Sequence, residues 1–274
     1  MILTPIRMIR AMILMLLTLV FSSEVLAKTH TTTASQKSHL TKASNKQVSS
    51  KQEYSRNSAK SSSLPDLRKY PSGTPRKKAF LRTVMPYITS QNAAITAERN
   101  WLISKQYQGQ WSPAERARLK DIAKRYKVKW SGNTRKIPWN TLLERVDIIP
   151  TSMVATMAAA ESGWGTSKLA RNNNNLFGMK CMKGRCTNAP GKVKGYSQFS
   201  SVKESVSAYV TNLNTHPAYS SFRKSRAQLR KADQEVTATA MIDKLKGYST
   251  KGKSYNNYLF AMYQDNQRLI AAHM

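Results

Sequence analysis

Acidic residues are scarce in this sequence of 274 residues, which has 14 Asp and Glu against 45 Lys and Arg. The formal net charge is +31. Such an excess implies a polyanionic partner, because it creates a positive potential that attracts polymers of opposite charge. Charge alone does not decide between nucleic acid and the anionic surface of a cell envelope.

Long hydrophobic runs are absent beyond the N-terminus. The apolar run at 11–21 is shorter than the roughly 20 residues that a membrane-spanning helix needs. Arg7 and Arg10 precede it and the small-residue segment Val25–Ala27 follows it, which is the pattern of a secretory signal peptide. We therefore expect removal of residues 1–27 and export to the periplasm or envelope, with a retained anchor as the alternative.

Cysteine is nearly absent, and the two cysteines present, Cys181 and Cys186, bracket a short turn. In an oxidising compartment such a pair usually forms a disulfide, which is our prediction. The histidines are scattered: His30, His39, His216 and His273. Without a second cysteine pair or a paired histidine motif, we expect no metal and no other cofactor.

Apolar residues are sparse in 28–76, where Thr, Ser, Lys, Asn and Gln dominate. Such a stretch cannot bury enough apolar surface to offset its chain entropy, so we predict a disordered basic linker. It is either a solvated tether or a tail that docks on the anionic envelope. Export and the lack of a recognised nucleic-acid-binding motif argue against nucleic acid as a partner. We expect a monomer.

Two further regions follow the linker. Residues 77–148 show helical spacing and predict a helical N-terminal segment, in which Pro86 kinks or splits the first helix. Residues 149–274 predict a second domain that begins with a helix from Pro150 and ends with helices at about 224–245 and 254–272. Capping boxes mark two other helix starts, Ser112 with Glu115 and Ser201 with Glu204.

The segment 166–200 differs from its surroundings. Four asparagines at Asn172–Asn175 indicate a turn, and Val193–Phe199 alternates in the manner of a strand. We predict a small β lobe of two or three strands here. The expected fold class is therefore α+β, mainly helical.

Glu161 lies at the end of the small-residue helix that starts at Pro150, and Gly163, Trp164 and Gly165 follow it closely. A carboxylate at a helix C-terminus faces the unfavourable end of the helix dipole, so a structural role explains it poorly. The glycines leave open space, and Trp164 can form an apolar wall. A partly desolvated carboxyl in that place can keep a proton, as the general acid in glycoside cleavage must.

Four sequence blocks together resemble the glucosaminidase family of peptidoglycan hydrolases: Ala159–Gly165, Asn175–Lys180, Tyr196–Phe199 and Gly247–Thr250. The resemblance covers roughly 150–272. It implies a lysozyme-like catalytic domain with a cleft between a helical body and a β lobe, and β-N-acetylglucosaminidase activity on glycan strands.

The resemblance also implies roles for single residues. Glu161 matches the catalytic acid of the family, and Tyr248 matches a tyrosine that the family places near that acid. Phe177 and Gly178 match residues that shape the floor of the cleft.

Three other residues are candidates for substrate binding. Trp164 and Tyr196 can stack on sugar faces. Asn175 can hydrogen-bond acetamido groups, although an asparagine turn is the simpler interpretation. Phe199 and Tyr209 are interpreted as core residues.

The sequence departs from the family where many members have a second carboxylate, because residues 166–203 contain no Asp or Glu. Glu204 belongs to a capping box. Either the acetamido group of the substrate assists, with Tyr248 orienting it, or the distant Asp243 reaches the site; we prefer substrate assistance. Two alternatives to a glucosaminidase stay open: a lytic transglycosylase or muramidase, and a non-catalytic wall-binding protein. Whether the protein also has amidase activity is left open.

Overall fold

The computed structural model describes residues 63–181, 186, 189–245, 248 and 252–274. The predicted signal peptide and residues 28–62 of the predicted linker lie outside this described part.

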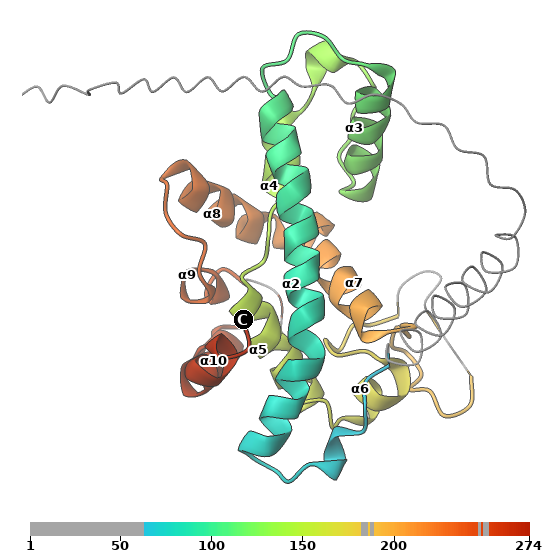
Figure 1. Cartoon of the computed structure of the whole chain (residues 1–274), viewed down its shortest axis with the longest axis vertical. Helices are drawn as coiled ribbons and strands as arrows, with labels where there is room; N and C mark the ends of the chain where they lie inside the picture. Colours follow the sequence, from blue (N-terminus) through green and yellow to red (C-terminus); the bar gives the residue numbers. More distant parts are fainter. Residues whose placement is uncertain (1–62, 182–185, 187–188, 246–247, 249–251) are drawn as a thin grey trace, which may run out of the picture. The chain divides into compact units, whose positions relative to one another are not determined.

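Helices supply nearly all regular structure in the described residues, which confirms the mainly helical part of the predicted fold class (Figure 1). The α-helices are α2 (Thr74–Lys105), α3 (Pro113–Arg125), α4 (Trp139–Arg145), α5 (Thr151–Ser162), α6 (Lys168–Asn173), α7 (Val202–Thr215), α8 (Ser220–Lys231), α9 (Ala238–Ile242) and α10 (Lys253–Ala271). Short 3₁₀ helices lie at η1 (Leu67–Lys69), η2 (Thr134–Lys136) and η3 (Pro217–Tyr219). Of the helices described, none has both the length and the apolar character needed to cross a membrane.

The predicted β lobe is the part of the fold class that the structure corrects. The described residues between α6 and α7 form two isolated antiparallel bridges, Lys180 with Tyr196 and Cys186 with Ser197, and no strand. A side-chain amide replaces the neighbouring strand, because Asn173 pairs with both the N–H and the C=O of Val193. Gly195 then takes a φ of 77°, which interrupts the extended backbone.

The predicted helix starts agree better with the structure. The Ser112 side chain accepts from the N–H of Glu115, whose carboxylate accepts from the N–H of Ser112, so this capping box is confirmed. Pro86 lies inside α2 and does not split it. The single helix predicted at 224–245 is instead α8 followed by α9, because the chain turns between them where Asp233 has a φ of 52°.

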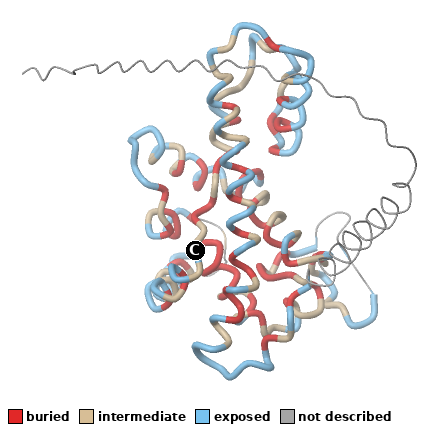
Figure 2. Tube along the Cα trace, in the orientation of Figure 1, coloured by how far each residue is buried: buried red, intermediate tan, exposed pale blue. Residues whose placement is uncertain are grey.

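Helix α5 is buried along most of its length and packs against α2, α9 and α10 (Figure 2). Its buried residues include three alanines, Ala155, Ala158 and Ala159. Small side chains allow neighbouring helices to approach closely, so α5 can occupy the interior between α2 and α10. The helix that carries Glu161 is therefore held on several sides.

Folded structure begins within the C-terminal end of the predicted linker, before its expected boundary at residue 76. Leu64 and Leu67 are buried against the rest of the core. They pack on Gly165, where an added Cβ would lie 2.6 Å from a methyl carbon of Leu67. Gly165 also has a φ of 79°, which other residues rarely adopt. The start of the folded chain thus packs against the loop that follows the Glu161 helix.

A buried carboxylate, Asp147, joins three parts of the fold. It lies just before α5, and its oxygens accept two hydrogen bonds from the Arg230 side chain at 3.0 and 3.2 Å. Arg99 of α2 and the fully buried Arg226 of α8 complete the cluster at 3.6 and 3.7 Å. Burial lowers the pKa of Arg226 to about 10, and the nearby Asp147 carboxylate opposes that shift.

We expect Asp147→Asn to destabilise the fold by about 3–5 kcal/mol, because it leaves buried guanidinium groups without their counter-charge. Urea unfolding of the two proteins measures the change. Asp121→Asn is the matched control, since Asp121 pairs with Arg125 on the exposed face of α3 and should cost less than about 1 kcal/mol. Equal losses in the two variants would contradict a structural role for the Asp147 cluster.

Candidate active site

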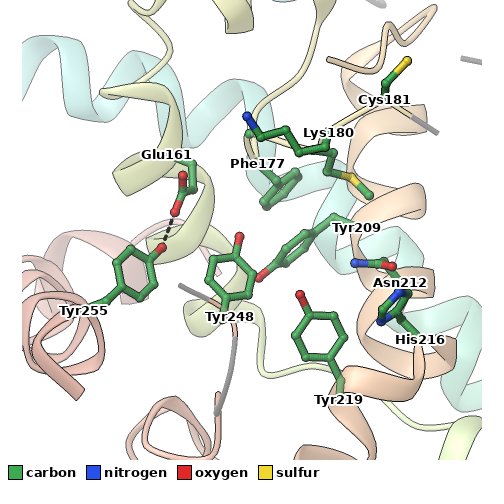
Figure 3. Close-up of a pocket in the computed structure, with 12 residues that line it drawn as sticks. Glu161, Phe177, Lys180, Cys181, Tyr209, Asn212, His216, Tyr219, Tyr248 and Tyr255 are labelled. Atoms are coloured by element: carbon green, nitrogen blue, oxygen red, sulfur yellow. Dashed lines mark hydrogen bonds between the residues drawn. The ribbon is translucent and has the colours of Figure 1, made fainter. Parts of the chain in front are cut away.

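A cavity of about 600 Å³ opens beside the C-terminal end of α5 (Figure 3). This volume lies within the range of about 300–1,000 Å³ that is usual for small-molecule sites. The lining combines one carboxylate with many aromatic rings: Glu161, Phe177, Gly178, Met179, Lys180, Cys181, Tyr209, Asn212, His216, Tyr219, Tyr248 and Tyr255. Four of these residues are tyrosines, and Glu161 is the sole Asp or Glu among them.

Glu161 reaches the cavity because α5 ends abruptly after it. Gly163 takes the left-handed conformation with a φ of 57° and caps the helix. Trp164 follows with a φ of 55°, and its N–H donates to the carbonyl of Ala159 at 2.9 Å. The chain therefore turns away at once, which leaves the half-buried Glu161 side chain at the cavity wall.

The Glu161 carboxyl group is held on one side and confined on the other. Tyr255, in the first turn of α10, donates its hydroxyl hydrogen to Oε1 (Figure 3). The other oxygen, Oε2, lies 3.3 Å from the place that a Cβ on Gly178 would occupy. Burial raises the pKa of Tyr255, and Tyr248 and Glu161 raise it further, so Tyr255 stays protonated and remains a donor.

Aromatic rings form the wall opposite Glu161. Tyr248 stacks on Tyr255 with ring centroids 5.5 Å apart and meets Tyr209 edge to face at 6.4 Å. Phe177 stacks on Tyr209 at 3.9 Å. Burial also raises the pKa of Tyr248 and of Tyr209, so both hydroxyl groups stay neutral. The wall offers apolar ring faces together with neutral hydroxyl groups, which suits a sugar.

Sequence reasoning singled out several residues that the structure brings together here. Glu161, Tyr248, Phe177 and Gly178 all line the cavity. Cys181 lies at its edge and forms a disulfide with Cys186.

The three predicted sugar-binding residues lie outside the cavity lining. Trp164 packs edge-on against Phe80 at 5.6 Å, with the Lys77 ammonium 5.1 Å from its ring centroid. The ring is thus engaged with α2. Contact between Trp164 and a substrate stays a prediction, and the packing of the ring against α2 argues against it.

Asn175 and Tyr196 have structural partners as well. Asn175 is 1% exposed, and its amide donates to the carbonyls of Met179 and Ser197 at 2.8 and 3.0 Å. The Tyr196 hydroxyl accepts from the Lys180 ammonium at 2.9 Å. Lys180 itself lines the cavity, so Tyr196 is linked to the cavity through Lys180.

The two acids considered as partners for Glu161 lie elsewhere. Asp243 is exposed at the end of α9 and is not part of the lining. The Ser201 side chain caps α7 by accepting from the N–H of Glu204, but the Glu204 carboxylate accepts from the N–H and the hydroxyl of Ser200, at 2.7 and 2.8 Å, one residue before the partner that the predicted capping box requires. Among the described residues, no group of three His, Cys, Asp or Glu side chains is arranged to hold a metal ion.

Sequence reasoning missed Tyr255, Tyr219, His216 and Asn212. The Tyr255–Glu161 bond joins residues 94 positions apart, so no local pattern contains it. The concentration of tyrosines at 248, 255 and 258 was the available signal, since aromatic residues commonly line sugar-binding sites.

We expect Gly178→Ala to lower glycan hydrolysis, the activity implied by the resemblance, by about 10–100-fold, because a new methyl group would displace the Glu161 carboxyl. The measurement is the release of reducing ends from glycan strands. Gly195→Ala is the matched control: Gly195 also has a positive φ, but no atom of the described residues, its chain neighbours apart, lies within 4 Å of the place of its Cβ, so it tests the backbone strain alone. Equal activity in both variants would show that crowding at Glu161 has no effect.

Comparison with known proteins identifies relatives of this chain. Residues 138–268 match the glucosaminidase family, described as mannosyl-glycoprotein endo-beta-N-acetylglucosaminidase. The chain is 98% identical to protein Bax of Escherichia coli (strain K12) over 274 residues, which cover 100% of both chains. No solved structure matches the chain. The cavity residues lie within the matched segment, whereas α2 and α3 precede it. The chain therefore belongs to the same family as protein Bax, and its residues 138–268 form a domain of the glucosaminidase family of glycoside hydrolases, as its motifs predicted.

Proposed function

We propose that this protein hydrolyses the glycan strands of peptidoglycan as a β-N-acetylglucosaminidase, with Glu161 as the general acid. The observation that carries the proposal is a single carboxyl group, oriented by a tyrosine, in a cavity walled by aromatic rings. Aromatic faces suit the apolar faces of sugar rings, and one positioned acid suits the protonation of a leaving oxygen.

In this mechanism Glu161 gives its proton to the oxygen that links N-acetylglucosamine to N-acetylmuramic acid. Tyr255 holds Oε1, so Oε2 is the oxygen free to face the substrate beside Gly178. The absence of a side chain at Gly178 leaves room for that oxygen. The departing sugar takes the proton, and Glu161 becomes a carboxylate.

The lining supplies no second carboxylate at the separations of about 5–9.5 Å that paired-acid glycosidases use. This supports substrate assistance. The acetamido oxygen of the N-acetylglucosamine unit attacks its anomeric carbon as the glycosidic bond breaks, giving a cyclic oxazolinium ion. In this proposal the Tyr248 hydroxyl, which lines the cavity, orients the acetamido group. Water then opens the ring, and the Glu161 carboxylate accepts the proton from that water.

The decisive variant is Glu161→Gln, which keeps the shape of the side chain and removes the transferable proton. We expect turnover to fall by at least about 100-fold, while sedimentation with purified sacculi persists. Glu235→Gln, an acid outside this cavity, is the control and should retain full turnover. If Glu161→Gln cleared sacculi as fast as the unmodified protein, Glu161 would not be the general acid.

The products distinguish the alternative enzymes. A glucosaminidase leaves reducing N-acetylglucosamine ends, a muramidase leaves reducing N-acetylmuramic acid, and a lytic transglycosylase leaves anhydro-muramyl ends. Mass spectrometry of borohydride-reduced products separates the three, and we expect reduced N-acetylglucosamine. Substrate assistance also predicts retention of the anomeric configuration, which NMR of the first product reports. Inversion would instead point to a base that acts on water directly.

A second candidate function is non-catalytic wall binding. The net charge of +31 and the missing second carboxylate favour it. Binding would then weaken with added salt, and Glu161→Gln would change nothing. For either function we infer export after removal of residues 1–27, with the basic stretch 28–62 attracting the chain to the anionic envelope.

A further inference from the structure

A second cavity adjoins the first across α7. It measures about 290 Å³ and shares the lining residue Asn212 with the first cavity. The rest of its lining is one face of α7 together with one residue that follows α3: Glu204, Ser207, Ala208, Thr211, Thr215 and Lys127. The α7 residues recur every three or four positions, which places them in a single stripe along the helix.

The two cavities differ in chemistry. The first is walled by Phe177 and four tyrosines, whereas the second has no aromatic residue in its lining. Its walls instead present hydroxyl groups, an amide, an ammonium and a carboxylate. Sugar rings gain most from aromatic faces, while a charged peptide gains most from hydrogen bonds and ion pairs. The second cavity therefore suits a peptide better than a further sugar.

Lys127 is the positively charged residue in the lining of this cavity. It has a φ of 53° in the turn after α3, and its carbonyl accepts from the Arg145 guanidinium at 2.7 Å. The backbone position is thus held, while the side chain is exposed. Among the described residues, its ammonium group forms no ion pair. Lys127 also precedes the segment 138–268 that matches the glucosaminidase family.

We propose that this second cavity binds the acidic peptide that muramoyl sugars carry, with Lys127 pairing with a peptide carboxylate. The inference rests on the proposed function for the identity of the polymer. A sugar in the first cavity would carry its peptide past Asn212 onto the outer face of α7. The α2–α3 region would then select glycan strands that still bear their peptides.

The test measures binding in the full chain carrying Glu161→Gln, so that ligand is not consumed. The two ligands are soluble glycan oligomers with their peptides and the same oligomers after amidase removal of the peptides. By calorimetry we expect about tenfold tighter binding of the peptide-bearing ligand, the effect of one charge-assisted hydrogen bond. Lys127→Asn should abolish most of this preference, since Asn tolerates the positive φ and lacks the charge. Lys127→Arg should restore it.

Lys129→Asn is the matched control, because Lys129 is exposed nearby and does not line the cavity; it should keep the full preference. Equal affinity for the two ligands, a preference that Lys127→Asn leaves intact, or no binding of either ligand would overturn the inference. Reducing-end release by the unmodified protein is scored separately. If the chain prefers the peptide-bearing ligand but the unmodified protein does not cleave it, the hydrolase proposal is contradicted and the peptide site is still supported.

Discussion

The burial of α5 constrains the whole site. This helix packs against α2, α9 and α10, and its small alanine side chains allow these helices to approach closely. Its last turn therefore delivers the Glu161 carboxyl to one place at the cavity wall, and the Tyr255 hydroxyl from α10 holds it there. Because both partners belong to packed helices, the position of the acid is set by the core and not by a flexible loop.

The chemistry of the cavity follows from its single carboxyl group. With one acid and several neutral tyrosine hydroxyl groups, the lining can orient polar groups, but it offers no second negative charge to stabilise a sugar cation. In the proposed mechanism the substrate supplies the group that the protein lacks. An acetamido group next to the reacting carbon can be that group. The proposed reaction therefore needs no second carboxylate from the segment between α6 and α7.

The part of the chain that precedes the family segment is integrated with it. Arg99 of α2 joins Asp147 immediately before α5, and Leu67 packs on Gly165 immediately after it. Both ends of the acid-bearing helix are thus fixed by residues of 63–105. The chain that follows this region reaches Lys127 beside α7, the residue to which we assign substrate selection in our proposal.

The sequence by itself determined several helix starts and the family, and it singled out Glu161 as the candidate acid, because caps, prolines and the Glu161 motif act within a few residues of one another. It also indicated Tyr248, Phe177 and Gly178, which line the cavity. Only the tertiary structure decided that Trp164 and Asn175 turn to the interior, that asparagine amides replace the strands, and that Tyr255 reaches Glu161. The physical reason is range: a cap is a contact between neighbours in sequence, whereas a side chain's partner across 94 residues depends on how whole helices pack.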